Sequence, residues 1–122
     1  MAFHDPTLDR VTNYKGKIRD FTSKELKKIR VNDKFQIPFL EDLLDSFSQN
    51  YFSIDMKSDE SVIPLIKLVR KMNAIDRVCF ASFNQQRLDY VREEFSNKCI
   101  SSMGPKEIVK TKLCSIFNIC LL

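Results

Sequence analysis

Residues 51–57 have the sequence YFSIDMK, in which apolar and polar side chains alternate along the whole stretch. Successive side chains of an extended chain point to opposite faces, so this alternation indicates a β-strand with one apolar face and one polar face. The apolar face consists of Phe52, Ile54 and Met56, and the polar face consists of Tyr51, Ser53, Asp55 and Lys57. The predicted fold is built outward from this strand.

Two further strands follow, and a helical segment precedes each of them. Residues 77–83 (RVCFASF) and 98–103 (KCISSM) are short and largely apolar, which is typical of buried strands. Residues 61–72 and 84–95 instead carry apolar side chains three and four positions apart, as amphipathic helices do. These positions are Val62, Leu65, Ile66, Val69 and Met72 in the first helix, and Leu88, Val91 and Phe95 in the second. The strands recur about every twenty to twenty-five residues with a helix between them, and this pattern predicts a parallel sheet of the α/β class.

Local signals mark the ends of these elements. Pro64 falls in the first turn of the first helix, where its missing N–H costs little. Asn84 can cap the second helix through its side-chain oxygen. The pair Gly104-Pro105 closes the third strand, and residues 106–112 predict a further helix.

Two helical segments precede the first strand. Thr22 and Glu25 have the spacing of a capping box at the start of TSKELKKI. Pro38 opens a helix over PFLEDLLDSF, in which Leu40, Leu43, Leu44 and Phe47 share a face. No linker and no short repeat interrupts the sequence, so we expect one α/β domain over residues 1–122.

The polar face of the 51–57 strand favours a barrel over an open doubly wound sheet. Helices cover both faces of a doubly wound sheet, so its central strands are apolar on both sides. The inner face of a (β/α)8 barrel strand is polar toward its carboxyl end, where barrel enzymes place their chemistry. Asp55 and Lys57 share that face, and could hold a divalent cation and an anionic oxygen respectively. An edge strand with one solvated face is the alternative interpretation.

Composition excludes several other function classes. The only glycines are Gly16 and Gly104, which excludes a Gly-rich phosphate loop. The formal net charge is +4, and no long basic run indicates nucleic-acid binding. A basic cluster is predicted to be a solvated helix face, because no aromatic residues interleave with it; its members are Lys24, Lys27, Lys28 and Arg30.

The cysteines and the chain ends bear on location. Cys79, Cys99, Cys114 and Cys120 form no C-x-x-C pair, so we expect buried free thiols and a reducing compartment rather than a disulfide or a metal role. No signal peptide is visible at the start. The mostly apolar residues 113–122 are too few to span a bilayer. We therefore expect a cytoplasmic protein without a membrane span.

Several motifs resemble the glycerophosphodiester phosphodiesterase family. The stretch FHDPTLDRVTN, with the only histidine of the sequence, is similar to the family's second histidine segment, His-Asp-x-x-Leu-x-Arg-x-Thr, which follows the third barrel strand. IPFLEDLLDSF resembles the approach to strand four, and FSIDMK resembles the Asn-Ile-Glu-Ile-Lys segment on it. VCFASFNQQRLDYVREEF and CISSMGP resemble the fifth strand with its helix and the sixth strand. The similarity covers nearly all of residues 2–112, in the family's order.

The resemblance implies a fold, an activity and three site residues. The family consists of TIM-barrel hydrolases that convert glycerophosphodiesters to glycerol 3-phosphate and an alcohol, in glycerophospholipid metabolism, with two histidines and a divalent metal, Ca²⁺ or Mg²⁺. It implies that His4 transfers protons, that Asp55 is a metal ligand and that Lys57 binds the substrate phosphate. Asp55 stands where the family usually has glutamate, and Ser53 where it usually has asparagine.

The resemblance also implies that only part of the barrel is present. The family's His-Arg and Glu-x-Asp pairs do not occur in these 122 residues, and a full barrel needs about 250 residues. We expect strands three to six with their helices, with residues 1–3 as the end of strand three. We further expect weak metal binding, no activity by the chain alone, and self-association through open sheet edges. The alternative is a non-catalytic α/β fragment that serves as an interaction module.

Two other carboxylates and the position of the site complete the predictions. Asp5 and Asp9 are expected to have turn and capping roles, with Asp9 paired to Arg10 or Arg19. His4, Asp55 and Lys57 are expected to gather at the carboxyl end of the parallel sheet.

Overall fold

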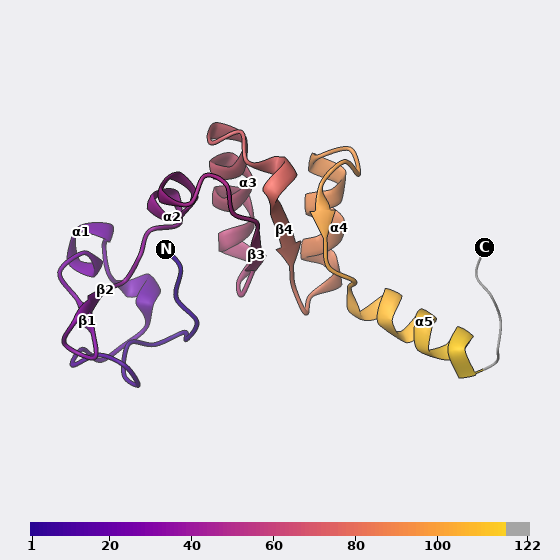
Figure 1. Ribbon diagram of the computed structural model, residues 1–122. Helices are drawn as coiled ribbons and strands as arrows, with labels where there is room; N and C mark the ends of the chain where they lie inside the picture. The colour runs from indigo at the N-terminus through magenta and orange to yellow at the C-terminus, as the bar shows by residue number, and fades with distance from the viewer. Residues whose placement is uncertain (117–122) are drawn as a thin grey trace. The chain divides into compact units, whose positions relative to one another are not determined.

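The computed structural model describes residues 1–116, which belong to two compact units, Met1–Ser48 and Gln49–Leu122 (Figure 1). The two units are described one after the other. The single domain predicted for residues 1–122 stays a prediction.

The second unit is built on a three-stranded parallel sheet in the order β3-β4-β5. Its strands are β3 (Phe52–Asp55), β4 (Val78–Ala81) and β5 (Ile100–Ser101). Ile54 of β3 lies opposite Phe80 of β4, and Phe80 lies opposite Ser101 of β5. The parallel pairing and the order confirm the α/β prediction, although each strand is shorter than its apolar pattern.

A helix follows each strand (Figure 1). These helices are α3 (Val62–Lys71), α4 (Gln85–Glu94) and α5 (Pro105–Ile116); the short 3-10 turns η2 (Asp59–Ser61) and η3 (Ile75–Arg77) lie before and after α3. Pro64 is the third residue of α3, as predicted for a first-turn proline. The Asn84 side chain accepts hydrogen bonds from the backbone N–H groups of Gln86 and Arg87, which confirms the predicted cap.

The helices α3 and α4 cover one face of the sheet, and the apolar core of this unit lies between that face and the two helices (Figure 1). Phe80 of β4 and Val78 are fully buried, and the Phe80 ring lies 5.4 Å from the Phe95 ring at the end of α4. The other buried apolar side chains of the unit are Met56, Val62, Leu65, Ile66, Val69, Ala74, Leu88 and Val91. The alternation read from residues 51–57 is therefore correct, since Met56 is 1% exposed and Tyr51 is 80% exposed.

The opposite face of the sheet is open to solvent. Large apolar residues of this face and of the loops that continue its strands are exposed; they are Tyr51, Phe83, Ile100 and Met103. In a closed barrel this face would be the inside. The unit thus has the strand and helix order of part of a barrel with its inner surface uncovered.

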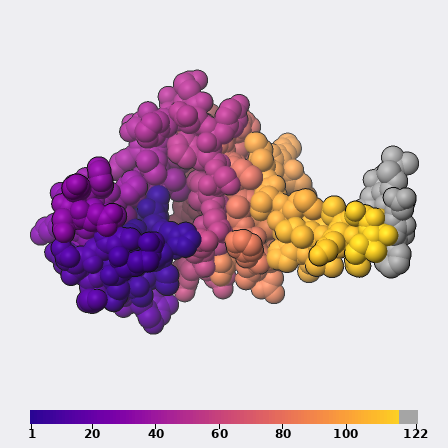
Figure 2. Space-filling view, turned by 60° about the horizontal axis from the view of Figure 1, so that its bottom comes forward, coloured from indigo at the N-terminus to yellow at the C-terminus, as the bar shows by residue number. Residues whose placement is uncertain are grey.

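A polar network fixes the start of α5. The Glu107 carboxylate accepts hydrogen bonds from Arg92 Nη1 (2.9 Å), from Gln85 Nε2 (3.0 Å) and from the backbone N–H of Gly104. The hydrogen bond from Arg92 is the main cause that lowers the pKa of the Glu107 carboxyl. Beyond this first turn α5 has no buried residue, and the space-filling view shows its surface open (Figure 2).

The first unit consists of short elements around a small core. They are η1 (Ile18–Asp20), α1 (Ser23–Leu26), β1 (Arg30–Val31), β2 (Phe35–Gln36) and α2 (Leu40–Ser46). Leu8, Leu26, Ile29 and Ile37 form the core. The capping box is present, because the Thr22 hydroxyl accepts from the Glu25 N–H and the Glu25 carboxylate accepts from the Thr22 N–H.

Two local predictions for this unit are wrong, and one pair of strands was not predicted. Residues 1–3 form no strand, and the Ala2 N–H donates to the Pro38 carbonyl. The helix predicted from Pro38 begins only at Leu40, and Leu44 is its only buried residue. The antiparallel hairpin of β1 and β2 was not predicted, because its apolar alternation is only two residues long on each side.

The described residues also bear on the thiols and on the membrane. Cys79, Cys99 and Cys114 are free and partly buried, and Cys120 lies outside the described residues. Burial raises the pKa of the Cys99 thiol. Among residues 1–116, no helix has the length and hydropathy that crossing a membrane requires.

Candidate functional site

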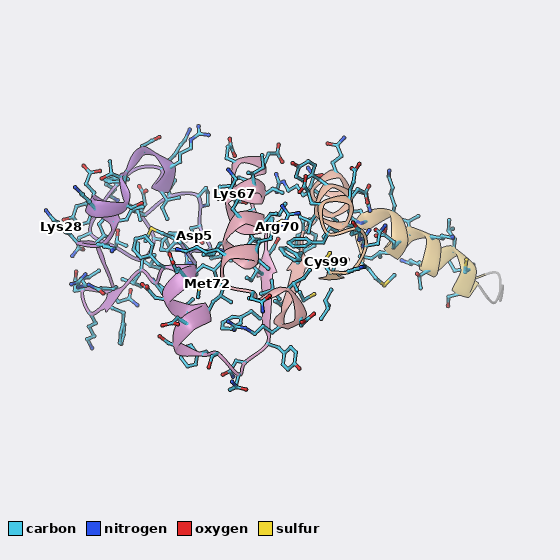
Figure 3. All side chains as sticks on the ribbon, turned by 90° about the horizontal axis from the view of Figure 1, so that it is seen from above. Asp5, Lys28, Lys67, Arg70, Met72 and Cys99 are labelled. Atoms are coloured by element: carbon cyan, nitrogen blue, oxygen red, sulfur yellow. The ribbon has the colours of Figure 1, made fainter. Side chains whose placement is uncertain are left out.

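The histidine lies on a loop of the first unit and contacts a neighbouring carboxylate. His4 Nδ1 is 2.7 Å from Asp5 Oδ1, and Arg10 Nε donates to Asp5 Oδ2 at 2.5 Å. The His4 side chain is 80% exposed, whereas that of Asp5 is 15% exposed. The hydrogen bonds from Arg10 and then from His4 lower the pKa of Asp5 to about 2, so this carboxyl is ionised at neutral pH. Figure 3 shows Asp5 on this segment.

The other residues of the His-Asp-x-x-Leu-x-Arg-x-Thr motif hold the loop. Leu8 is fully buried in the core of the unit. Its N–H donates to the Gly16 carbonyl (3.0 Å), and its own carbonyl accepts from Thr12 Oγ1 (2.8 Å). The backbone of Gly16 has a φ of +110°, a conformation that glycine adopts without strain. The motif therefore packs and hydrogen-bonds a loop whose first residues are His4 and Asp5.

The predicted partners of the two carboxylates need one correction. Arg10 pairs with Asp5, not with Asp9, and Arg19 Nε lies 4.0 Å from Asp20. Asp9 Oδ2 instead accepts from the Gly16 N–H at 3.1 Å, and this bond lowers the pKa of Asp9. Asp9 thus has the turn role that was expected, while Asp5 contacts the histidine.

The Asp5 contact decides which ring nitrogen of His4 is free. A carboxylate at Nδ1 favours the tautomer in which Nδ1 carries the proton and donates it. Nε2 then has a free lone pair and faces no partner among the hydrogen bonds of the described residues. An exposed imidazole in this tautomer can accept a proton at Nε2 and later return it.

Asp5→Asn is expected to remove this tautomer preference. Asparagine can present either its oxygen or its amide group to Nδ1, so neutral His4 should populate both tautomers. The ¹⁵N chemical shifts of the ring nitrogens measure this directly, since His4 is the only histidine in the sequence. Asp9→Asn is the matched control, because it removes a carboxylate from the same loop without touching the ring. Unchanged ring shifts in Asp5→Asn would show that Asp5 does not orient His4.

The second part of the candidate site lies at the carboxyl end of β3. Asp55 is the last residue of that strand, and Lys57 follows two positions later. Lys57 Nζ is 2.6 Å from Asp55 Oδ2, and it lies 5.9 Å from the centre of the exposed Phe83 ring. The side chains of Asp55 and Lys57 are 31% and 48% exposed. The carboxyl ends of parallel strands share one edge, so this ion pair stands at the edge that was predicted.

Two residues behind this ion pair were not identified from the sequence. Arg87 Nη1 donates to the Met56 carbonyl at 2.8 Å, and Ser82 Oγ donates to the same oxygen at 3.1 Å. Ser82 is a polar residue on the covered face of an otherwise apolar strand pattern, which was the available signal. Arg87 had no such signal, because an arginine in the first turn of a helix is ordinarily solvated.

The described residues do not complete a metal site. Within residues 1–116, no three His, Cys, Asp or Glu side chains are grouped so that they could hold one ion. Asp55 offers a single carboxylate, and Lys57 is already paired with it. Ca²⁺ takes about six to eight oxygen ligands, and Mg²⁺ requires a nearly octahedral set of oxygen ligands. This donor set does not fit either ion, so no chemical step is derived through a metal.

His4 belongs to one compact unit, and Asp55 and Lys57 belong to the other. The predicted gathering of all three at one sheet edge therefore stays a prediction. What the structure brings together is His4 with Asp5 and Arg10, and separately Asp55 with Lys57.

Comparison with known proteins identifies the family. Residues 1–112 match the glycerophosphoryl diester phosphodiesterase family, and the chain belongs to this family. A glycerophosphodiester phosphodiesterase of Caldanaerobacter subterraneus is 33% identical over 107 residues, which cover 76% of this chain and 44% of that protein. A Mycobacterium tuberculosis protein named "Probable glycerophosphodiester phosphodiesterase 2" is 26% identical over 104 residues, or 85% of this chain and 39% of that protein.

A solved structure supports the fold. The glycerophosphodiester phosphodiesterase of Agrobacterium tumefaciens strain C58 superposes with a TM-score of 0.70 at 22% identity. The match covers 83% of this chain and 46% of that one. The fold is therefore part of a TIM barrel, as predicted, and the chain spans less than half the length of these relatives.

Proposed function

We propose that this chain supplies one proton-transfer group and one phosphate-binding group to the hydrolysis of a glycerophosphodiester. The reaction consumes water and yields glycerol 3-phosphate and an alcohol. The observation that supports this most is the His4–Asp5–Arg10 arrangement, which lies within the 112 residues that match the family. It places an exposed imidazole against a carboxylate that favours the Nδ1–H tautomer, which leaves Nε2 for general acid–base catalysis.

His4 has one of two proton transfers to perform. Water must lose a proton as it attacks phosphorus, and the leaving alcohol oxygen must gain one on the opposite side. A single imidazole cannot reach both oxygens in one in-line step. These 122 residues contain one histidine, so in this proposal His4 performs one transfer and a different group performs the other.

Lys57 and Asp55 have electrostatic roles in this proposal. The Lys57 ammonium is half exposed at the sheet edge and can approach a phosphoryl oxygen, where charge develops during the reaction. The phosphate would then compete with Asp55 for that ammonium. Asp55, once released, would offer one oxygen to a divalent ion, which would need further ligands that residues 1–116 do not group with it.

The activity test compares the chain with a completed barrel. The purified chain, incubated with glycerophosphocholine and Ca²⁺ or Mg²⁺, should release no glycerol 3-phosphate above the blank. We define the barrel chimera as the Caldanaerobacter relative in which residues 1–112 of this chain replace the region they align with. The barrel chimera should release glycerol 3-phosphate, because residues 1–112 of this chain bring His4, Asp55 and Lys57 into an otherwise complete barrel.

Two outcomes would contradict the proposal. A barrel chimera that is folded by circular dichroism, yet inactive with both metals, would show that these residues do not perform the family's chemistry. Turnover by the isolated chain that disappears in His4→Ala would show that no second proton-transfer group is needed.

A further inference from the structure

We propose that Arg87 is a positioning residue that keeps Asp55 and Lys57 on the same side of the β3 backbone. It contacts neither side chain and acts through the carbonyl of Met56, the residue between them. This inference rests on the proposed function, since it concerns how that candidate site is held.

The peptide groups of Met56 are fixed by three hydrogen bonds. The Met56 N–H donates to the Ala81 carbonyl at 2.8 Å, which extends the β3–β4 pairing by one residue. The Met56 carbonyl accepts from Arg87 Nη1 (2.8 Å) and from Ser82 Oγ (3.1 Å). Both lone pairs of that oxygen therefore have donors, and the Met56 side chain is 1% exposed.

This arrangement matters because β3 ends at Asp55. Residues two apart project to one face only while the backbone between them stays extended. The strand pairing holds the N–H side of Met56, but the carbonyl side, which leads to Lys57, depends on Arg87 and Ser82. Loss of the Arg87 bond would free the Met56–Lys57 peptide to rotate and let the Lys57 ammonium leave the Asp55 carboxylate.

The Arg87 side chain is itself held in place. Its Nε donates to Asp59 Oδ1 at 2.6 Å, and the side chain is 19% exposed. The backbone N–H of Arg87 donates to Asn84 Oδ1, and the backbone N–H of Asn84 donates to Ser82 Oγ at 3.1 Å. The turn from β4 into α4 thus presents Ser82 and Arg87 together to the end of β3.

An ion pair with Asp59 is the competing explanation for Arg87. The Asp59 side chain is 80% exposed, and exposed ion pairs contribute little to stability. The bond to the Met56 carbonyl is partly buried and is donated by a charged group, which makes it the stronger contact. The two explanations differ in what Asp59→Asn should do.

The test measures hydrogen exchange and carbonyl shifts in the full chain by NMR. The Met56 N–H to Ala81 bond extends the β3–β4 pairing past the end of β3, so it should open more often once the next peptide is free to rotate. Arg87→Gln should therefore speed amide exchange at Met56 by about ten- to hundredfold, the range that corresponds to the loss of one charged hydrogen bond. It should also move the ¹³C shift of the Met56 carbonyl and the ¹⁵N shift of Lys57. Asp59→Asn should leave these three readouts near wild type.

Arg70→Gln is the matched control. Arg70 Nη2 donates to the Glu94 carbonyl (2.6 Å) and to Glu94 Oε2 (3.1 Å), so it also joins one carbonyl and one carboxylate (Arg70 is labelled in Figure 3). Its loss should leave exchange at Met56 unchanged. A merely structural role for Arg87 would instead make the two glutamine variants alike.

The inference is overturned if Arg87→Gln leaves Met56 exchange unchanged, or if Asp59→Asn reproduces its effect. Should Arg87→Gln fail to fold, Arg87→Lys serves instead, because its single ammonium cannot bind the carbonyl and Asp59 as a fork. In the barrel chimera, Arg87→Gln should lower glycerol 3-phosphate release about tenfold more than Arg70→Gln, following the same lost bond. An inactive barrel chimera would count against the proposed function, while the exchange data would still decide the role of Arg87.

Discussion

His4→Ala in the barrel chimera should lower the rate of glycerol 3-phosphate release by about 10²–10⁴-fold, the usual contribution of a general acid or base. His4 is the only histidine in this sequence, and histidine is the side chain that enzymes use most often for proton transfer. Its Nε2 is free to exchange a proton because Asp5 occupies Nδ1. Alanine removes the proposed proton-transfer group and leaves Lys57, the proposed phosphate-binding group, in place, so the loss should appear in kcat.

The design of this test separates catalysis from folding. The His4 side chain is 80% exposed, so its removal should not shift the thermal midpoint of the barrel chimera. Asp9→Asn is a suitable control, since Asp9 belongs to the same loop and bonds the Gly16 N–H rather than the imidazole. A rate loss under about threefold in His4→Ala, far below the general acid–base range, would remove His4 from the mechanism.

The sheet could be predicted because its strands are covered on one side only. The alternation in residues 51–57 sets which side chains meet the helices, and buried Met56 and exposed Tyr51 follow it. The helix caps were also local, so Asn84 and the Thr22–Glu25 pair could be identified from spacing. These signals need only a few neighbouring residues, which a sequence displays directly.

The first unit was harder to predict because its turns depend on unusual backbone angles. The hairpin of β1 and β2 turns at Asn32 and Asp33, whose φ angles are +49° and +58°. Asn and Asp tolerate this region better than other residues with a Cβ. The Lys34 N–H then donates to the Val31 carbonyl at 3.1 Å. Two-residue strands on either side gave no periodicity that could have revealed the hairpin.

The residues of the candidate site also differ in whether the sequence alone could identify them. His4, Asp55 and Lys57 were proposed as site residues from motifs, and the contact of Asp5 with His4 could have been expected from their adjacency. Arg87 lies thirty-one positions from Met56 in sequence and binds its carbonyl, which leaves no pattern in either segment. Contacts of a side chain with a distant main-chain group require the fold before they can be seen.

Phe80→Ala should have the largest effect on stability of any single change considered for the second unit. Phe80 is fully buried in the middle strand, opposite Ile54 and Ser101, with its ring 5.4 Å from that of Phe95. Truncating a buried phenylalanine costs about 3–5 kcal/mol, since it loses apolar burial and leaves a cavity. A small domain has only about 5–15 kcal/mol in total. We therefore expect Phe80→Ala to be largely unfolded in urea concentrations at which the wild type is folded.

Phe83→Ala is the matched control, because it removes the same ring from a position three residues further along. Phe83 is 87% exposed beside Lys57, and such a surface change should alter the free energy of unfolding by no more than about 0.5 kcal/mol. Urea titration followed by circular dichroism measures both variants. Equal losses would mean that the Phe83 face is also covered in solution, as it would be in a self-associated chain. A large loss for Phe80 alone would establish that the helix-covered face supplies the stability of this unit without the rest of a barrel.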